Sequence, residues 1–444
     1  MSPGLERVAV KARNDKQCKF TSLAHHITPE LLIRNVNKIP LSSGSGVDGK
    51  SVLCTRKHSV ELAAETISEI HRHGYRPPPV KRVYIPKPGK SKKRPIGIPN
   101  VWDRAVQRSC ANILEAIFEE DFCDFSYGGR PKRNCHQAIG VLSYHAACSK
   151  TSWVFEADIK NFFGNLDHER LLEFVSHRVG DPRILCLIRR WLKAGVMEGG
   201  KLERSEVGTP QGGSISVVLS NIYLHYVLDL WFEKVVKPRL SGEAHLIRYL
   251  DDFVVCFQHH SDARRFRKAL EGRLAKFNLE LEPSKTKTIR MGKFAARDSK
   301  QFDGKKPPTL TFLGFTLFGS KYPWGSYAVG FKPASERVRR FLQKLKEDLR
   351  RIMHFPMKAQ QTLINQKLRG FYNYFGLPLC STVLNSIFEQ VKRIWKKSLS
   401  RRSNSGRVNW EKFNKILSHF PLLRPKLKYT VYEFSVFSRQ QAGG

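Results

Sequence analysis

The chain has 444 residues, of which 77 are Lys or Arg and 39 are Asp or Glu, so its formal net charge is +38 and its pI is about 10.1. Such a charge favours a polyanionic partner, with DNA or RNA ahead of the alternative, a membrane surface. A membrane-spanning helix is excluded because no run of about 18 apolar residues exists, and a zinc site is disfavoured because none of the nine cysteines forms a C-x-x-C pair.

The N-terminal region, residues 1–75, is predicted to contain short helices. Its first 20 residues are polar and basic, without an apolar core, and we expect a loose arm rather than an export signal. Scattered cysteines in a chain without a signal peptide favour reduced thiols. The cytoplasm is therefore the expected location.

Two β-prone runs, 81–86 and 94–99, flank a basic segment and predict a hairpin. The following elements are predicted in chain order: a helix at 102–120, a strand at 153–158, a helix at 168–179, a buried helix at 215–231, a hairpin at 245–258, a helix carrying Phe266, Leu270, Leu274 and Phe277, and a strand at 311–315. This order is typical of a split β-α-β unit, an α+β fold whose antiparallel sheet has helices on one face.

From residue 334 the sequence predicts basic helices, with one at about 359–375 and another at 383–399. The last of these has an apolar stripe and an opposite face with Lys392, Arg393, Lys396 and Lys397. A charge run of this kind is usually a solvated surface. The overall charge favours a nucleic-acid contact instead.

Asp251 and Asp252 occupy the tip of the predicted hairpin, within Arg248-Tyr249-Leu250-Asp251-Asp252-Phe253. A lone Asp-Asp is most often a polar turn. Two carboxylates at one tip also suit a hard cation such as Mg²⁺, and a two-metal site needs about three such ligands. Asp158, at the end of the 153–158 strand, is the candidate third ligand, with a helix N-cap or strand end as its alternative role.

Eight blocks follow one another along the chain: Arg94–Gln107, Tyr127–Ala138, Asp158–Phe163, Gly208–Ser214, Tyr249–Asp252, Pro283–Lys287, Phe312–Phe315 and Leu368–Phe375. In this order they resemble reverse transcriptases, and most closely the bacterial group II intron-encoded branch. Together they extend over about residues 20–430. The resemblance implies a right-hand polymerase with fingers, a ferredoxin-like palm and an all-α thumb or maturase domain.

The domains implied are an N-terminal extension (1–75), fingers and palm (76–318), a helical thumb or maturase domain (319–400) and a basic nucleic-acid-binding tail (401–444). No zinc-supported endonuclease domain is expected, because neither C-x-x-C pairs nor a His-rich cluster follow the thumb.

The same resemblance implies roles for individual residues. Asp158, Asp251, Asp252 and the Ile159 carbonyl would bind two Mg²⁺ ions, with Mn²⁺ as the alternative. Phe163 would be a steric gate against ribonucleotides, with a core Phe as its alternative role. Gln211 and Gly212 would line the nucleotide pocket, and Lys87 and Arg94 would bind the triphosphate, with Lys90, Lys92 or Lys93 as substitutes for Lys87. Lys285 would donate a proton to pyrophosphate, unless it is simply a surface lysine.

The implied function is RNA-directed DNA synthesis from dNTPs on a primed RNA template. Structured group II intron RNA is the further expected partner, bound to assist splicing and mobility in a bacterial nucleoid or ribonucleoprotein. The alternatives are a domesticated reverse transcriptase in host defence or repair and a splicing-only maturase. Departures from the family pattern are Leu250 in place of the usual Ala, Gly129 where many members have Phe, and Gly164 where many have Asp. Leu250 is expected to press near the primer terminus.

Overall fold

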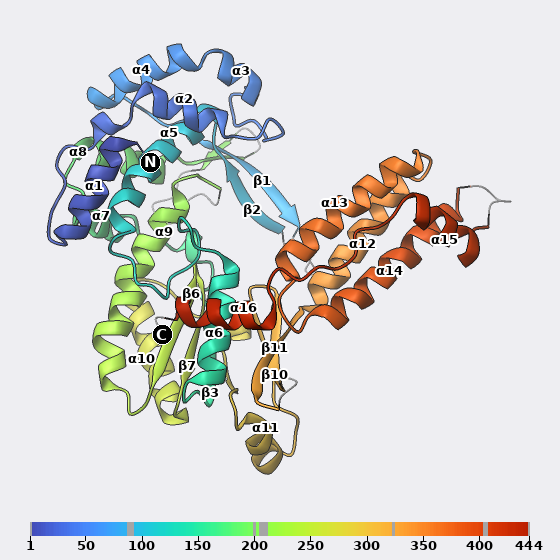
Figure 1. Cartoon of the computed structure of the whole chain (residues 1–444). Helices are drawn as coiled ribbons and strands as arrows, with labels where there is room; N and C mark the ends of the chain where they lie inside the picture. Colours follow the sequence, from blue (N-terminus) through green and yellow to red (C-terminus); the bar gives the residue numbers. More distant parts are fainter. Residues whose placement is uncertain are drawn as a thin grey trace.

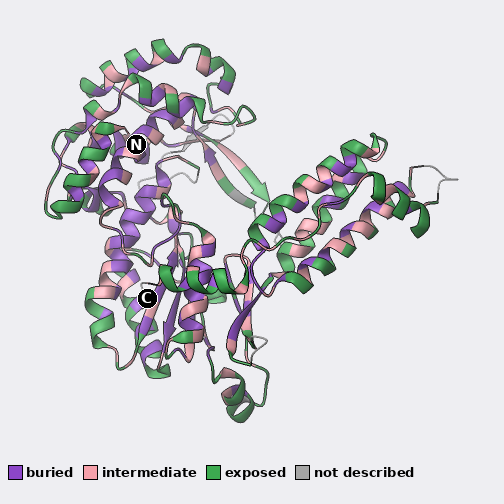
Figure 2. Ribbon diagram, in the orientation of Figure 1, coloured by how far each residue is buried: buried purple, intermediate pink, exposed green. Residues whose placement is uncertain are grey.

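The computed structural model describes residues 2–86, 93–198, 201–203, 212–321, 325–402 and 407–442, except the side chains of 94, 201–203 and 303. Figure 1 shows three parts: a group of helices at the upper left, a central sheet below it, and an elongated helical bundle at the right. Figure 2 shows buried residues running through the central sheet, α5 and α9, whereas the bundle is exposed over much of its surface.

The N-terminal helices pack around one long helix. They are α1 (Pro3–Asn14), α2 (Pro29–Asn37), α3 (Val52–Lys57) and α4 (Ser59–His71), and the long helix is α5 (Val101–Phe118). Helix α1 buries Leu5, Val8 and Ala12 and contacts α5. The predicted loose arm is therefore wrong, because spacings of three and four residues place these small apolar side chains on one helix face.

A four-stranded sheet lies beside these helices in the order β2-β1-β4-β5. Its strands are β1 (Val80–Pro86), β2 (Lys93–Ile98), β4 (Val196–Glu198) and β5 (Lys201–Glu203). The predicted β1–β2 hairpin is confirmed, with Ile85 paired to Arg94; its basic tip lies outside the described residues. Parallel pairing of Val80 with Val196 joins the hairpin to the segment after α7 (His168–Ser176) and α8 (Pro182–Lys193).

The central sheet has the order β6-β7-β3-β8, and every neighbouring pair is antiparallel, as predicted. Its strands are β3 (Trp153–Asp158), β6 (Ala244–Tyr249), β7 (Asp252–Phe257) and β8 (Lys287–Arg290). One face packs on α10 (His260–Ala275), and the core on that side includes α9 (Ser216–Leu224) with its π-helical continuation, His225–Asp229 and Phe232–Val236.

The other face of the sheet packs on α6 (Cys135–Cys148), so helices cover both faces rather than one. The reason is visible in β7, where Phe253 and Val255 join one core and Val254 and Cys256 join the other. A strand that is apolar on both faces has to be covered on both.

The segment predicted as one strand at 311–315 is two strands. β9 (Leu310–Phe312) turns into β10 (Phe315–Lys321), which pairs with β11 (Tyr327–Pro333). Leu313 and Gly314 both have positive φ, 49° and 78°, which a continuous strand does not allow. Between β8 and β9, a short helix, α11 (Ala295–Asp298), and a π-helical turn (Ser299–Asp303) project at the bottom of Figure 1.

The C-terminal region is helical, as predicted, with α12 (Ser335–Arg351), α13 (Met357–Phe375) and α14 (Ser381–Leu399) forming the bundle. Two further helices follow, α15 (Trp410–His419) and α16 (Val431–Gln441), and α16 returns to pack on α6. The segment predicted as a basic tail is thus partly anchored on the central sheet's covering helix. Among the described residues, no helix has the length and apolar character needed to cross a membrane.

Candidate active site

The adjacent aspartates lie at the tip of the β6–β7 hairpin, as predicted. Tyr249 pairs with Asp252 across the hairpin, so Leu250 and Asp251 form a two-residue loop. Leu250 has φ of 58°, the left-handed region that two-residue hairpin loops require and that Leu rarely adopts. The tight loop holds Asp251 beside the first residue of β7.

Asp158 is the direct neighbour of Asp252 in the sheet. It is the last residue of β3, and the β3–β7 register pairs it with Asp252. Directly opposed residues have Cβ atoms about 5 Å apart, so two carboxylates from strands far apart in sequence meet at one edge. A cavity of about 50 Å³ lies against both, with Phe312 and Leu313 also lining it.

Lys285 completes this cluster. Its Nζ donates a hydrogen bond to Asp158 Oδ2. Burial lowers the pKa of Lys285, but the bond to Asp158 and the charges of Asp158, Asp252 and Asp251 outweigh that effect and raise its pKa overall. The lysine is therefore a cation held at the carboxylates.

Asp252 has an unusual protonation equilibrium. Loss of hydration on burial contributes most to raising its pKa, the negative charges of Asp251 and Asp158 contribute next, and the pKa reaches about 7. Two neighbouring negative charges disfavour a third at the same edge, so the pKa of Asp252 has to rise. A cation at this edge would relieve the repulsion.

The Ile159 carbonyl is directed toward the same edge. The residues on either side of Ile159 bond to the segment before β8: Glu282 N–H donates to the Asp158 carbonyl and Lys160 N–H donates to the Glu280 carbonyl, both at 2.8 Å. Carbonyl directions alternate along an extended chain. The Ile159 carbonyl therefore points away from that segment, toward the side on which β7 lies.

Of the other predicted substrate-binding residues, the structure describes some and leaves others outside its described ranges. Phe163 is half-buried beside the fully buried Phe162, with ring centroids 5.4 Å apart. Gly212 has φ of 126°, and a Cβ there would collide with the Gly97 carbonyl of β2, so glycine brings this turn against the hairpin. Lys87, Lys90, Lys92 and Gln211, and the side chain of Arg94, lie outside the described residues.

Sequence reasoning missed a buried network beneath the hairpin tip. Arg248 and Asp229 have fully buried side chains and pair through two hydrogen bonds, at 2.7 and 2.5 Å. The Arg248 guanidinium also donates to the Leu250 carbonyl at 3.2 Å and to Asn221 Oδ1 at 3.0 Å. The sequence features that could have indicated this pair are a single Arg within an apolar strand and a single Asp within an apolar helix.

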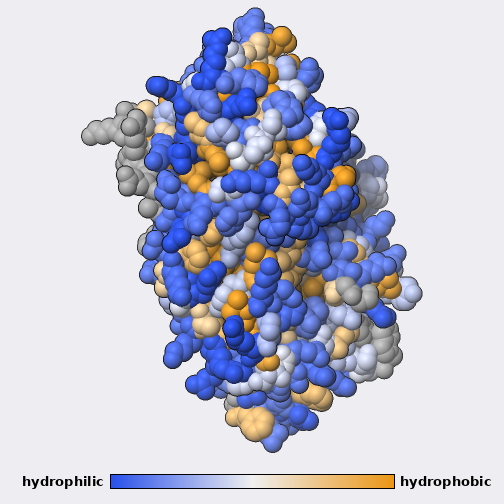
Figure 3. All heavy atoms as spheres, turned by 90° about the vertical axis from the view of Figure 1, so that its left-hand side faces the viewer, coloured by the Kyte–Doolittle hydropathy of each residue, from blue (hydrophilic) through white to orange (hydrophobic). Residues whose placement is uncertain are grey.

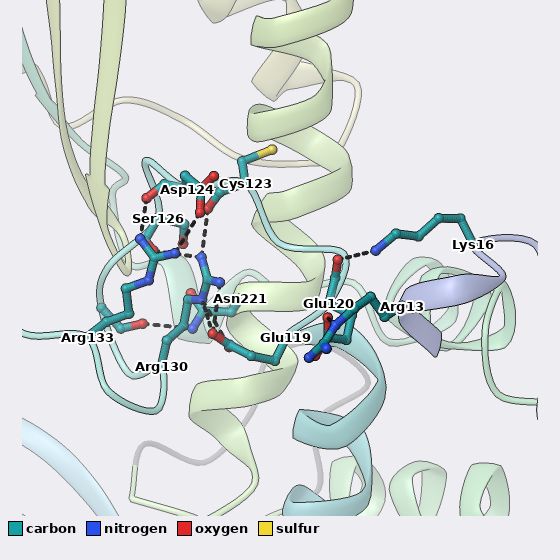
Figure 4. Close-up of polar contacts among 11 residues, drawn as sticks. Arg13, Lys16, Glu119, Glu120, Cys123, Asp124, Ser126, Arg130, Arg133 and Asn221 are labelled. Carbon is teal, nitrogen blue, oxygen red and sulfur yellow. Dashed lines mark hydrogen bonds and ion pairs between the residues drawn. The ribbon is translucent and has the colours of Figure 1, made fainter. Parts of the chain in front are cut away.

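A loop at residues 123–130 extends this network (Figure 4). Arg130 donates to both carboxylate oxygens of Glu119 and to the Cys123 and Ser126 carbonyls. The backbone at Ser126 pairs with Arg248 as an added edge of β6. The loop therefore lies directly against the strand that leads into Leu250.

The Leu250 side chain packs against this loop. A Cβ on Gly128 would lie 2.8 Å from Leu250 Cγ, and a Cβ on Gly129 would lie 3.3 Å from Leu250 Cδ2. Asn221 Nδ2 donates to the Gly128 carbonyl at 2.8 Å and holds the glycines in place. The contact seen for Leu250 is thus with the loop, and a contact with a primer terminus stays a prediction.

Comparisons with known proteins agree on one family. The reverse transcriptase (RNA-dependent DNA polymerase) model matches residues 85–317. Protein YkfC of Escherichia coli K12 is 32% identical over 378 residues, covering 76% of this chain and 94% of YkfC. The group II intron-encoded protein LtrA of Lactococcus lactis subsp. cremoris is 32% identical over 246 residues, covering 54% of this chain but only 41% of LtrA.

Proposed function

The chain belongs to the reverse transcriptase (RNA-dependent DNA polymerase) family, and on that premise we propose that it is an RNA-directed DNA polymerase that adds dNTPs to a primer 3′-hydroxyl. The observation that carries the proposal is the pairing of Asp158 with Asp252 at the edge where Asp251 turns the hairpin. Carboxylates of separate strands at one edge are the donor set of metal-assisted nucleotidyl transfer.

The chemistry of these donors fits Mg²⁺, since all are hard oxygen ligands. Among the described residues, no three His, Cys, Asp or Glu side chains are grouped closely enough to hold an ion outright, and Lys285 holds Asp158 by a hydrogen bond. We propose that Asp158, Asp251, Asp252 and the Ile159 carbonyl hold two Mg²⁺ ions together with substrate oxygens. Bound ions of this kind activate a 3′-hydroxyl and neutralise charge on pyrophosphate.

Lys285 has one role before nucleotide transfer and another during it. Held by Asp158, it balances the carboxylate charge; released, its ammonium group can donate a proton to the leaving pyrophosphate. While Lys285 is held by Asp158, its raised pKa keeps the ammonium group protonated. We assign Phe163 as the gate against ribonucleotides, Gly212 and Gln211 to the nucleotide pocket, and Arg94 and Lys87 to the triphosphate.

The finer architecture we propose is that of a right hand. Residues 1–75 are an N-terminal extension, 76–318 hold the fingers and the palm, 319–400 form the thumb or maturase domain, and 401–444 bind DNA or RNA. The central sheet with its carboxylate edge supports the palm assignment, and the projecting α12–α14 bundle supports the thumb (Figure 1).

We also propose structured group II intron RNA as a partner, in a bacterial ribonucleoprotein. The net charge of +38 and the similarity to proteins named as intron-encoded support this. Binding to the host intron should exceed binding to a scrambled RNA at physiological salt; equal binding would remove the maturase role.

The polymerase is tested by dNTP incorporation on a primed RNA template with Mg²⁺. Asp251→Ala is expected to lower the rate by several orders of magnitude. A matched control is Glu61→Ala, which removes an 82% exposed carboxylate from α4 and should leave the rate unchanged. Equal incorporation by the native chain and Asp251→Ala would refute the assignment.

A further inference from the structure

The end of the central sheet opposite the carboxylates carries an unusual stack. Strand β3 begins at Trp153 and ends at Asp158, so the two ends lie about 17 Å apart. The Trp153 ring stacks on the exposed His260, with centroids 4.0 Å apart and planes at 26°. The Arg290 guanidinium lies over the same ring, 4.5 Å from its centroid.

The stack continues outward onto the projection around α11. Arg290 also lies 5.4 Å from the centroid of Phe302, whose side chain is 64% exposed. Phe294 is 49% exposed and has Arg297 and Lys293 over its ring at 4.9 and 5.8 Å. Single exposed apolar side chains are normal. Here two phenyl rings within nine positions each carry cations on their faces.

On its other side, the stack borders a basic hollow on α10. A cavity of about 410 Å³ is lined by His260, Arg264, Arg267, Lys268, Glu271 and Thr288. Glu271 pairs with Arg267 at 3.1 Å, so the lining keeps a positive excess. Thr288 and Arg290 lie two residues apart on β8 and share one face of that strand. The hollow and the stack therefore form one continuous surface.

We propose that this surface, defined by Trp153, His260, Arg264, Lys268, Arg290 and Phe302 and called here the α10–α11 surface, binds an unpaired segment of RNA. Cations in the hollow bind its phosphates, and the exposed rings, with Phe294, stack on its bases, which is how single strands are held. An acidic protein would match the cations, but only a nucleic acid supplies a flat group with every phosphate along its chain. Figure 3, which faces the left-hand side of Figure 1, shows a largely hydrophilic surface with scattered hydrophobic residues.

This site rests on the proposed function only in taking RNA as the partner, and it adds a second RNA contact remote from the carboxylates. Because it lies at the far end of β3, an RNA could occupy it while a primed template is at Asp158 and Asp252. The structure therefore assigns to it a segment of structured RNA outside the copied duplex.

The test is binding of a fluorescent single-stranded RNA by anisotropy, with the polymerase site first saturated by a primer–template duplex. Phe294→Ala with Phe302→Ala should weaken binding by about 10-fold for each ring that stacks on a base. Arg264→Gln with Lys268→Gln should lower the slope of log affinity against log salt by about 1.4, since each phosphate contact on a single strand contributes about 0.7.

The matched controls are Leu53→Ala, which removes a 58% exposed apolar side chain from α3, and Lys57→Gln with Arg72→Gln, at the end of α3 and directly after α4. Helices α3 and α4 lie at the opposite end of the molecule from α11 (Figure 1). Neither should change binding of the labelled strand. dNTP incorporation should be unchanged in all four variants, so a failure of this site is separable from a failure of the polymerase assignment. Unchanged binding in both test variants would overturn the proposal. So would equal binding of a DNA strand, or of poly-glutamate, in place of RNA.

Discussion

The buried pair of Asp229 and Arg248 determines how firmly the Leu250–Asp251 turn is held. Both side chains are fully buried, and Asp229→Ala removes two charge-assisted hydrogen bonds while leaving the guanidinium in a dry interior. Breaking such a pair from one side costs about 3–5 kcal/mol. That is a large part of a typical unfolding free energy of about 5–15 kcal/mol, so Asp229→Ala should be strongly destabilised.

Urea unfolding followed by circular dichroism measures the effect. The control is Glu233→Ala, which breaks the half-exposed ion pair with Lys237 and should cost about 0–1 kcal/mol. If Asp229→Ala shifts the unfolding midpoint no more than Glu233→Ala does, the buried pair is not the support described above.

A second variant separates stability from positioning. Replacing both partners with apolar residues of similar size, Arg248→Met with Asp229→Leu, should restore most of the stability, because no charge is left unpaired. It also removes the donor to the Leu250 carbonyl. We therefore expect dNTP incorporation to stay low although the fold recovers; a full native rate would show that the pair serves folding alone.

Three further outcomes are expected. Leu250→Ala should lower the unfolding free energy by about 1–2 kcal/mol, less than for a fully buried leucine, and leave Mg²⁺-dependent incorporation intact; a lost rate in a stable variant would contradict the packing role. Phe163→Ala should raise ribonucleotide incorporation relative to dNTPs, whereas the exposed Phe302→Ala should not; an unchanged ratio would remove the gate. Burial lowers the pKa of His225 to about 4. Below pH 6.5 the unfolded state therefore binds a proton that the folded state does not, and the free energy of unfolding decreases as the pH is lowered. Native protein should lose about 2 kcal/mol more than His225→Gln between pH 7 and 5, and equal losses in urea titrations would refute this.

The carboxylate edge could be predicted from the sequence because its parts are local patterns. A hairpin tip is recognisable from two β-prone runs, and Asp158 ends a third. The register that places Asp158 opposite Asp252 depends on pairing strands 94 residues apart. The order of the predicted elements, typical of a split β-α-β unit, placed these strands side by side but did not determine which residues pair.

The support beneath the edge could not be predicted for the same reason. Asp229 and Arg248 lie 19 residues apart in the chain, on a helix and a strand. A buried charge in either element is unfavourable alone, and the two are acceptable only as a pair. The cover of α6 on the second sheet face, and the packing of α1 on α5, likewise depend on which surfaces meet and not on local periodicity.

The two departures from the family pattern at Leu250 and Gly129 form one packing feature. Gly129 has φ of 70°, and any side chain there would meet Val217 and, at 3.3 Å, the Leu250 Cδ2. Leu250 therefore fills space that the small Gly129 leaves open. The pattern implied by the family resemblance, with Phe on the loop and Ala at the tip, would place the large residue on the other side of the same contact. Exchanging a large residue on the loop for one on the tip conserves volume, which cores tolerate best. Packing against the loop is therefore sufficient to account for a leucine at this position of the hairpin tip.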